Sequence, residues 1–175
     1  MKAVFLDRDG VINRNLDHDY VKCWDEFEFL PQSLEAISML TRAEFPLIVV
    51  TNQACINKGI ISHAQCAEIH RRMIEEIEHA EGEICDIYYS PHRPDENSEY
   101  RKPKPGMFLK AKAKHNTDMG KSWMIGDKER DIIAANSAGI DNTILVRSGH
   151  RIDESNSNAK IILDSILQTK QIIKS

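Results

Sequence analysis

The stretch Val4-Phe5-Leu6-Asp7-Arg8-Asp9-Gly10 decides the fold, because it joins a short apolar run to two carboxylates one residue apart. The apolar run is typical of a buried strand, and alternation along that strand places Asp7 and Asp9 on the same side of its carboxyl end. Gly10 allows a sharp turn just beyond them. In such a pair, one Asp can attack phosphorus as a nucleophile while the other serves as general acid and then base. For this motif alone, an acidic turn without chemistry remains an equal alternative.

The composition indicates an ordinary globular chain. Its 175 residues suffice for one buried core and are few for two, so we expect a single domain over residues 1–175. A hydrophobic share of 41% and a charged share of 29% exclude an intrinsically disordered protein. The net charge of −4 argues against nucleic acid as a partner, because such proteins carry a basic footprint. The local excess of positive charge at Arg101, Lys102 and Lys104 fits one phosphate better than a duplex.

The sequence shows neither a leader peptide nor a membrane span. Met1-Lys2-Ala3 runs directly into the first expected strand, and no apolar run is long enough to cross a bilayer. The four cysteines (Cys23, Cys55, Cys66 and Cys85) are widely spread and form no C-x-x-C pair, which argues against a redox dithiol or a zinc knuckle. We therefore expect a cytoplasmic protein with reduced thiols, most of them packing residues, with Cys55 the thiol most open to a ligand.

Apolar runs alternate with amphipathic segments along the chain, which is the rhythm of β-α-β units that close a parallel sheet. Strands are expected over residues 3–6, 47–51, 87–90, 123–125, 143–146 and 161–163, and helices over 33–42, 64–80, 107–115, 131–138 and 165–173. The helix at 64–80 has the strongest signal, because Ser62 and Gln65 fit a capping box and its apolar stripe has core spacing. The polar stretch 153–158 is expected to be a loop. The predicted fold class is a three-layer α/β/α, Rossmann-like domain with a mainly parallel sheet.

Polar groups recur directly after successive strands of this predicted sheet. Each has a plain explanation on its own as a turn, a helix cap or a solvated charge. Because ligands bind beyond the carboxyl ends of parallel strands, all of them should lie on one rim. The groups are Asp7 and Asp9, then Thr51-Asn52-Gln53, then Arg101-Lys102-Pro103, and finally Gly126-Asp127-Lys128.

In order and spacing these four segments resemble the motifs of the haloacid dehalogenase (HAD) superfamily of aspartyl-nucleophile phosphatases, over residues 4–131. They are most similar to the branch that contains the heptose bisphosphate phosphatases and the histidinol-phosphate phosphatases. The resemblance implies a HAD core without a large cap domain. The connections at 13–30 and 54–86 agree, since neither could hold a separate folded cap.

The resemblance also implies roles for the acidic residues. Asp7 is the nucleophile and Asp9 the general acid/base, an order that the residues alone do not establish. Asp7, the Asp9 backbone carbonyl and Asp127 supply the hard oxygen ligands that suit Mg²⁺. Asp131, one turn beyond Asp127, is expected to orient a lysine or cap its helix rather than to bind the metal directly.

The remaining motif residues are expected to handle the phosphoryl group. Thr51 and Asn52 donate hydrogen bonds from side chain and backbone to its oxygens, where charge spreads in the transition state. Lys102, with help from Lys128, neutralises the transferring group.

A sugar site is implied by two further similarities. Asp17-His18-Asp19-Tyr20-Val21 resembles the Asp-His-Gly-Tyr-Val of the heptose enzymes, and residues 51–59 resemble their Thr-Asn-Gln-Ser-Gly-Ile-x-x-Gly, apart from Ala54-Cys55. By this resemblance Asp17, His18, Tyr20 and Gln53 line the sugar site. Arg101 binds the second, non-reacting phosphate, for which a planar guanidinium is suited. An ordinary surface loop with a packed aromatic remains the alternative for His18 and Tyr20.

The chain departs from this branch in one loop. Its relatives there carry a structural zinc site built as Cys-x-His followed by Cys-x-Cys, whereas this chain has Ser90-Pro91-His92 and Ser98-Glu99-Tyr100. One histidine does not make a closed tetrahedral site. We therefore expect no structural zinc, with the 91–100 loop either held by Pro91, Pro94 and local packing or more mobile than in the relatives.

Three hypotheses of function follow. The first is a Mg²⁺-dependent phosphatase that removes the 7-phosphate of D-glycero-D-manno-heptose 1,7-bisphosphate, in the supply of ADP- or GDP-heptose or lipopolysaccharide precursors. The second is a phosphatase for histidinol phosphate or another small sugar phosphate. The third is a non-catalytic phosphosugar-binding module, against which the intact Asp7, Asp9, Lys102 and Asp127 argue. Either a monomer or a small homo-oligomer fits the sequence.

Overall fold

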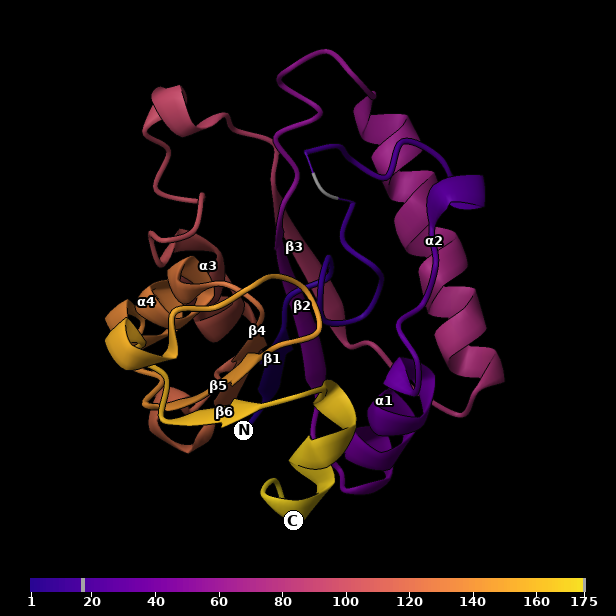
Figure 1. Cartoon of the computed structure of the whole chain (residues 1–175). Coiled ribbons are helices and arrows are strands. Elements are labelled where there is room, and N and C mark those ends of the chain that lie inside the picture. Colours follow the sequence, from indigo (N-terminus) through magenta and orange to yellow (C-terminus); the bar gives the residue numbers. More distant parts are fainter. Residues whose placement is uncertain (17, 175) are drawn as a thin grey trace.

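The computed structural model, which describes residues 1–16 and 18–174, contains a six-stranded, all-parallel sheet in the order β3-β2-β1-β4-β5-β6 (Figure 1). This arrangement confirms the predicted parallel α/β fold. The strands are β1 (Val4–Leu6), β2 (Leu47–Asn52), β3 (Asp86–Ser90), β4 (Trp123–Gly126), β5 (Asn142–Val146) and β6 (Ile161–Leu163).

Helices cover both faces of this sheet. The α-helices are α1 (Ser33–Arg42), α2 (His63–His79), α3 (Gly106–His115) and α4 (Glu129–Ser137). In Figure 1, α1 and α2 lie on one side of the strands and α3 and α4 on the other. Short 3-10 segments lie at Trp24–Glu26, Pro94–Glu96, Met119–Lys121, Glu154–Asn156 and Ile166–Gln171.

Strand β1 explains the three layers, because its side chains alternate between two apolar cores. Val4 and Leu6 join the core that includes Met73 of α2, whereas Phe5 lies in the other core and packs on Phe108 of α3 with ring centroids 5.2 Å apart. The order of the strands reverses at β1, which pairs with β2 on one side and β4 on the other. Such a reversal opens a crevice at the carboxyl ends of the strands.

Helix α2 has the predicted start and core face. Ser62 accepts a hydrogen bond from the Gln65 backbone while the Gln65 side chain reaches back to the Ser62 N–H, which completes the capping box. The apolar stripe from Cys66 to Ile77 is buried and therefore belongs to the core. None of the described helices is long and apolar enough to span a membrane.

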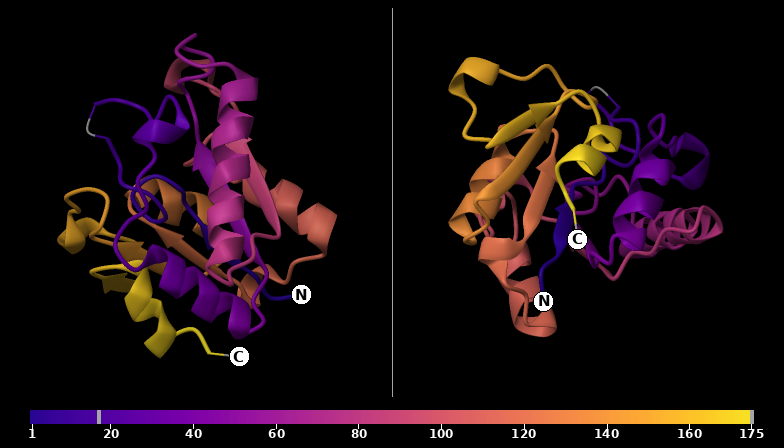
Figure 2. Two further views of the ribbon diagram at one scale, coloured as in Figure 1. Left: turned by 90° about the vertical axis from the view of Figure 1, so that its right-hand side faces the viewer. Right: turned by 90° about the horizontal axis from the view of Figure 1, so that it is seen from below.

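The C-terminal segment corrects one prediction. Residues 165–173 do not form an α-helix; they contain the 3-10 segment Ile166–Gln171, which lies beside α1 (Figure 2). Ile166 and Thr169, three residues apart, are the buried residues, which matches a three-residue turn. The Thr169 hydroxyl also donates to the Ile166 carbonyl at 2.6 Å, a local bond that competes with a regular α-helix.

Candidate active site

A cavity of about 400 Å³ opens at the carboxyl ends of β1 and β2. The predicted catalytic residues Asp7, Asp9 and Thr51 reach it. The predicted substrate-binding residues that line it are His18, Tyr20, Asn52, Arg101 and Lys128. Lys102 and Asp127 lie buried behind the wall, and Asp17 lies outside the described residues.

Lys102 connects two carboxylates at the floor of the cavity. Its Nζ lies 3.0 Å from Asp7 Oδ1 and 2.8 Å from Asp131 Oδ1, and it donates to the Val50 carbonyl at 2.7 Å. The Lys102 side chain is fully buried, and the two carboxylates hold its pKa above the ordinary lysine value despite that burial. Lys102 is therefore a fixed positive charge directly beside Asp7.

Asp131 holds the lysine and also caps helix α4. Its Oδ2 accepts a hydrogen bond from the Lys128 backbone N–H at 3.0 Å, while Oδ1 faces Lys102. Both of the expected roles are thus present. Burial opposes its ionisation, but the Lys102 and Arg130 charges bring the pKa of Asp131 below its ordinary value.

Asp127, unlike Asp131, has no hydrogen-bond donor on its carboxylate among the described residues. It is fully buried, and His150 Nε2 lies 3.6 Å from Oδ2. Burial first, and then the Asp131 and Asp7 charges, raise the pKa of Asp127 well above its ordinary value. A buried carboxylate without a hydrogen-bond donor is destabilised in its ionised form.

The residues here fit a divalent cation. Asp7, Asp127 and Asp131 each offer an oxygen, and the three atoms lie within 4.8 Å of one another. Two glycines keep room beside Asp127: a Cβ on Gly10 would lie 2.3 Å from Asp127 Oδ2, and one on Gly149 would lie 2.1 Å from it. Three clustered carboxylates, of which Asp127 accepts no hydrogen bond from a described residue, match the ligand preference of Mg²⁺.

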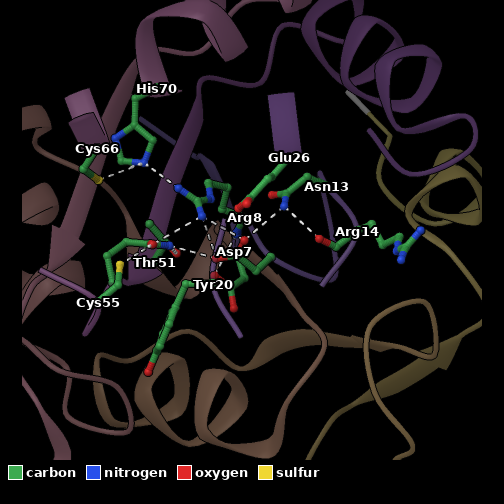
Figure 3. A network of polar contacts seen from close by, with 12 residues as sticks. Asp7, Arg8, Asn13, Arg14, Tyr20, Glu26, Thr51, Cys55, Cys66 and His70 are labelled. Carbon is green, nitrogen blue, oxygen red and sulfur yellow. Dashed lines mark hydrogen bonds and ion pairs between the residues drawn. The ribbon is translucent and has the colours of Figure 1, made fainter. Parts of the chain in front are cut away.

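Asp9 is held by contacts around Arg8, and Figure 3 shows Arg8 together with Asn13 and His70. The Arg8 Nη2 contacts both of its oxygens, at 2.8 and 3.0 Å, and the Asn13 amide donates to Oδ1 at 3.0 Å. Behind Arg8, the Nε2 of His70 lies 3.2 Å from Nη1. Burial lowers the pKa of His70 to about 3, so this ring is neutral and its Nε2 accepts a hydrogen bond from Arg8. Although burial opposes it, Arg8 holds the pKa of Asp9 below its ordinary value.

Gln53 requires a correction, since it does not face the cavity. Its side chain is buried; Nε2 donates to Asp9 Oδ2 at 2.8 Å and to the Thr51 hydroxyl at 2.9 Å, while Oε1 accepts from Arg8. These bonds occupy the amide on the protein side, so Gln53 supports Asp9 rather than a sugar. Cys55 is also buried, with its Sγ 3.6 Å from Gln53 Oε1, whereas Cys23 and Cys85 are the exposed thiols.

The Asn52 side chain positions the lysine segment. Its Nδ2 donates to the Lys102 carbonyl at 3.0 Å and its Oδ1 accepts from the Lys102 N–H at 3.1 Å. This two-way pairing fixes the backbone that carries Lys102 and occupies the amide. The Asn52 backbone, which lies beside the cavity, remains for the phosphoryl contact that the sequence predicts.

Polar contacts hold the 91–100 loop. Glu96 accepts two hydrogen bonds from the Asn57 amide, both 3.0 Å long, and Ser90 Oγ lies 3.1 Å from the His92 ring. At the base of the loop, Arg101 Nη1 donates to the His92 carbonyl at 2.9 Å. The loop thereby holds Arg101 where its side chain lines the cavity.

Several site residues were missed by the sequence reasoning. His70 lies on α2, far along the chain from the motifs, and no local signal marks it. Gly149 and His150, however, follow β5 directly, so the rule applied to the earlier strands would have found them. Arg130 in the first turn of α4 also lines the cavity.

Comparison with known proteins supports the same chemistry. A HAD-hydrolase-like family model matches residues 99–169. The D-glycero-β-D-manno-heptose-1,7-bisphosphate 7-phosphatase of Pasteurella multocida is 39% identical, over 99% of this chain and 97% of its own length. The enzyme of the same name from Vibrio cholerae is 42% identical, over 94% of this chain and 91% of its own length. The crystal structure of D,D-heptose 1,7-bisphosphate phosphatase from B. bronchiseptica, complexed with magnesium and phosphate, superimposes with a TM-score of 0.87 at 31% identity, covering 98% of this chain and 97% of that one.

Proposed function

The chain belongs to the HAD family of hydrolases that includes the heptose-1,7-bisphosphate 7-phosphatases, and from this premise we propose that it removes the 7-phosphate of D-glycero-β-D-manno-heptose 1,7-bisphosphate with Mg²⁺ as cofactor. One observation carries the proposal. Asp7, Asp127 and Asp131 crowd together at the end of β1 and β4, with Lys102 beside two of them and no donor on Asp127. This arrangement suits a site that receives a cation and a phosphate.

Asp7 acts as the nucleophile. Its Oδ1 is fixed by Lys102 at 3.0 Å and by the Arg8 backbone N–H at 2.7 Å, whereas Oδ2 accepts no hydrogen bond from a described residue. Oδ2 is therefore the oxygen that attacks phosphorus and forms the aspartyl-phosphate, while the bond to the sugar oxygen breaks. Lys102 offsets the repulsion between the carboxylate and the incoming phosphate.

Mg²⁺ would be held by Asp7, the Asp9 backbone carbonyl and Asp127, and when bound it supplies positive charge that offsets the charge on the phosphoryl oxygens. Thr51 and the Asn52 backbone, both beside the cavity, donate hydrogen bonds to those oxygens.

Asp9 moves the proton. In the free protein its contact with Arg8 keeps it ionised, but the approach of a negative phosphate raises the pKa of a neighbouring carboxyl and so favours its protonated form. Asp9 then gives this proton to the leaving sugar oxygen. In the second step it takes a proton from the water that attacks the aspartyl-phosphate, which releases phosphate and restores Asp7.

The sugar occupies the outer part of the cavity. His18 and Tyr20 line one wall, and Lys58 lies over the Tyr20 ring at 5.2 Å. Arg101 on the opposite loop is the group that we assign to the second phosphate.

Phosphate release with Mg²⁺ tests the proposal. The panel contains both anomers of heptose 1,7-bisphosphate, fructose 1,6-bisphosphate, histidinol phosphate and simple hexose phosphates. We expect the β-anomer of heptose bisphosphate to give the highest kcat/KM, and Asp7→Asn to abolish release. The surface substitution Asp95→Asn serves as the matched control. Preference for another substrate would overturn the assignment of the substrate but not the proposed mechanism. Phosphate release by Asp7→Asn would overturn the mechanism itself.

A further inference from the structure

Some of the cations that line the cavity form ion pairs and others do not. Arg8 and Lys102 are both ion-paired, with Asp9 and with Asp7 and Asp131. The other cations on the wall differ. Among the residues that the structure describes, no carboxylate forms an ion pair with the cavity side chains of Arg101, Lys128 and Arg130.

Arg130 is the least satisfied of these three cations. It is the second residue of α4 and only partly exposed, and its Nε is buried without a hydrogen-bond partner. A guanidinium has five N–H donors, and a buried donor without an acceptor destabilises the protein. A part-buried arginine in this state is expected where an anionic ligand supplies the missing acceptor.

Arg101 and Arg130 reach the cavity from different elements and repel each other. Arg101 comes from the end of the 91–100 loop and Arg130 from α4. Burial lowers the pKa of Arg101, and the Arg130 charge lowers it further, because the two guanidinium groups repel each other. Two like charges held in one pocket are stabilised when an anion lies between them.

The remaining donors suit a phosphate. Arg101 uses Nη1 on the His92 carbonyl at 2.9 Å, which leaves its other donors for a ligand. The transferring phosphoryl group already has Thr51 and Asn52 on the cavity lining, and Lys102 lies buried beside Asp7. The two guanidinium groups on the wall are therefore available to a second anionic group of the same substrate, and planar guanidinium groups bind phosphate oxygens in pairs.

We propose that Arg130, together with Arg101, binds the phosphate that is not transferred, and that this pair makes the protein select sugar bisphosphates over monophosphates. The inference rests on the proposed function, which provides the first phosphate site. It adds Arg130 as a second residue that determines specificity.

The test compares heptose 1,7-bisphosphate with heptose 7-phosphate, which differ only by the second phosphate. We expect Arg130→Met to lower kcat/KM for the bisphosphate about 10- to 100-fold, mainly through KM, because a charge-assisted contact is lost. The loss on the 7-phosphate stays below about threefold. Arg130→Lys, which keeps the charge without the planar fork, falls in between. Arg72→Met on the exposed face of α2 is the control for loss of an arginine.

A double-mutant cycle shows whether the two arginines share one ligand. For the bisphosphate, the losses in Arg101→Met and Arg130→Met should be clearly non-additive in the double variant, as expected for residues on one phosphate. Circular dichroism and Tm of each variant verify that it is folded.

Three results overturn the proposal. Equal losses of kcat/KM on the bisphosphate and the monophosphate in Arg130→Met would show that Arg130 contacts the transferring phosphate. Unchanged kcat/KM for the bisphosphate would show that Arg130 does not bind the substrate. If the wild-type protein does not hydrolyse heptose bisphosphate, the proposed function is wrong independently of this inference. The role of Arg130 is then measured by comparing kcat/KM for fructose 1,6-bisphosphate with that for fructose 6-phosphate. A wild-type protein that prefers no bisphosphate over its monophosphate also overturns it.

Discussion

Asp7 and Asp9 lie one residue apart on the same turn but in opposite electrostatic surroundings. Arg8 contacts both oxygens of Asp9, with Asn13 and Gln53 beside it, and the pKa of Asp9 is lowered. Asp7 instead shares Lys102 with another carboxylate, and burial raises its pKa. Both oxygens of Asp9 have donors, whereas in the Asp7 half Lys102 pairs with Asp7 and Asp131, and Asp127 accepts no hydrogen bond from a described residue.

The difference teaches how one short motif performs two kinds of chemistry. A self-sufficient carboxylate keeps its orientation with or without a ligand, which suits a group that moves protons. A cluster of three carboxylates around one lysine favours the binding of a cation, which suits a group that attacks a negatively charged phosphate. The predictions below test this contrast, beginning with the largest effect.

Removing the charge of Asp7 should have the largest effect. Asp7→Asn lacks a nucleophilic oxygen, so kcat should fall by at least about 10⁴-fold. Asp9→Asn leaves the nucleophile in place and should lose about 10²- to 10⁴-fold. Phosphate release from the proposed substrate measures both. A smaller loss in Asp7→Asn than in Asp9→Asn would reverse the assigned roles.

Removing Lys102 should destabilise the Asp7 half. Without Mg²⁺, Lys102→Met leaves Asp7 and Asp131 buried without their partner, so the free energy of unfolding should fall by about 3–5 kcal/mol. Urea denaturation measures it. The control Lys121→Met, on a lysine that is 76% exposed, should change it by less than about 0.5 kcal/mol. Equal effects of the two substitutions would show that the buried charge does not matter.

Filling the space beside Asp127 should weaken Mg²⁺ binding without removing a carboxylate. A Cβ in Gly149→Ala would lie 2.1 Å from Asp127 Oδ2 and must displace it. We expect the Kd for Mg²⁺ to rise about 10- to 100-fold, as for a change in the support of a ligand. Gly120→Ala is the matched control, because its Cβ would meet Asp118 Oδ1 at an ordinary 3.7 Å. Unchanged affinity in Gly149→Ala would argue against Asp127 as a ligand.

The smallest effect concerns pH and Mg²⁺ together. Asp127 and Asp7 have raised pKa values in the folded protein, so the folded state binds more protons than the unfolded chain between the ordinary carboxyl pKa and the raised one. The metal-free protein should therefore lose stability as pH rises through that window. Because Asp9 has a lowered pKa, it contributes the opposite slope at lower pH. The rise in Tm on adding Mg²⁺ should accordingly grow by a few degrees, roughly, from pH 5 to pH 7.5. A constant rise would contradict this.

The sequence predicted the features that follow from periodicity. Six apolar runs predicted the strands, and polar residues just after them predicted the rim, since both depend on local pattern. Gln53 was assigned to the sugar site by resemblance, and Cys55 to a ligand by its position beside residues 51–53; neither basis determines which way a side chain points, and both side chains are buried. The partners of Arg8 were not predictable, since His70 reaches it only through the packing of α2 on the sheet.

The unpredicted C-terminal 3-10 segment has a similar cause. The apolar residues in 165–173 fit a helix by spacing, but the segment packs beside α1 through residues three apart. The tertiary contact with α1 and the local hydrogen bond from Thr169 to Ile166 both favour the 3-10 winding over the α-helix that the spacing predicts. The sequence therefore predicts where chemistry is located better than it predicts which partners hold each group.

Calorimetric titration of Mg²⁺ into the wild-type protein, Asp127→Asn and Asp9→Asn tests the central contrast most directly. Asp127→Asn should weaken Mg²⁺ binding by about 100-fold or more, because it removes a carboxylate ligand. Asp9→Asn should change binding by less than about threefold, since only its backbone carbonyl is proposed as a ligand and Arg8 already balances its side chain. Equal losses in the two variants, or tight binding by Asp127→Asn, would contradict the division between the two halves.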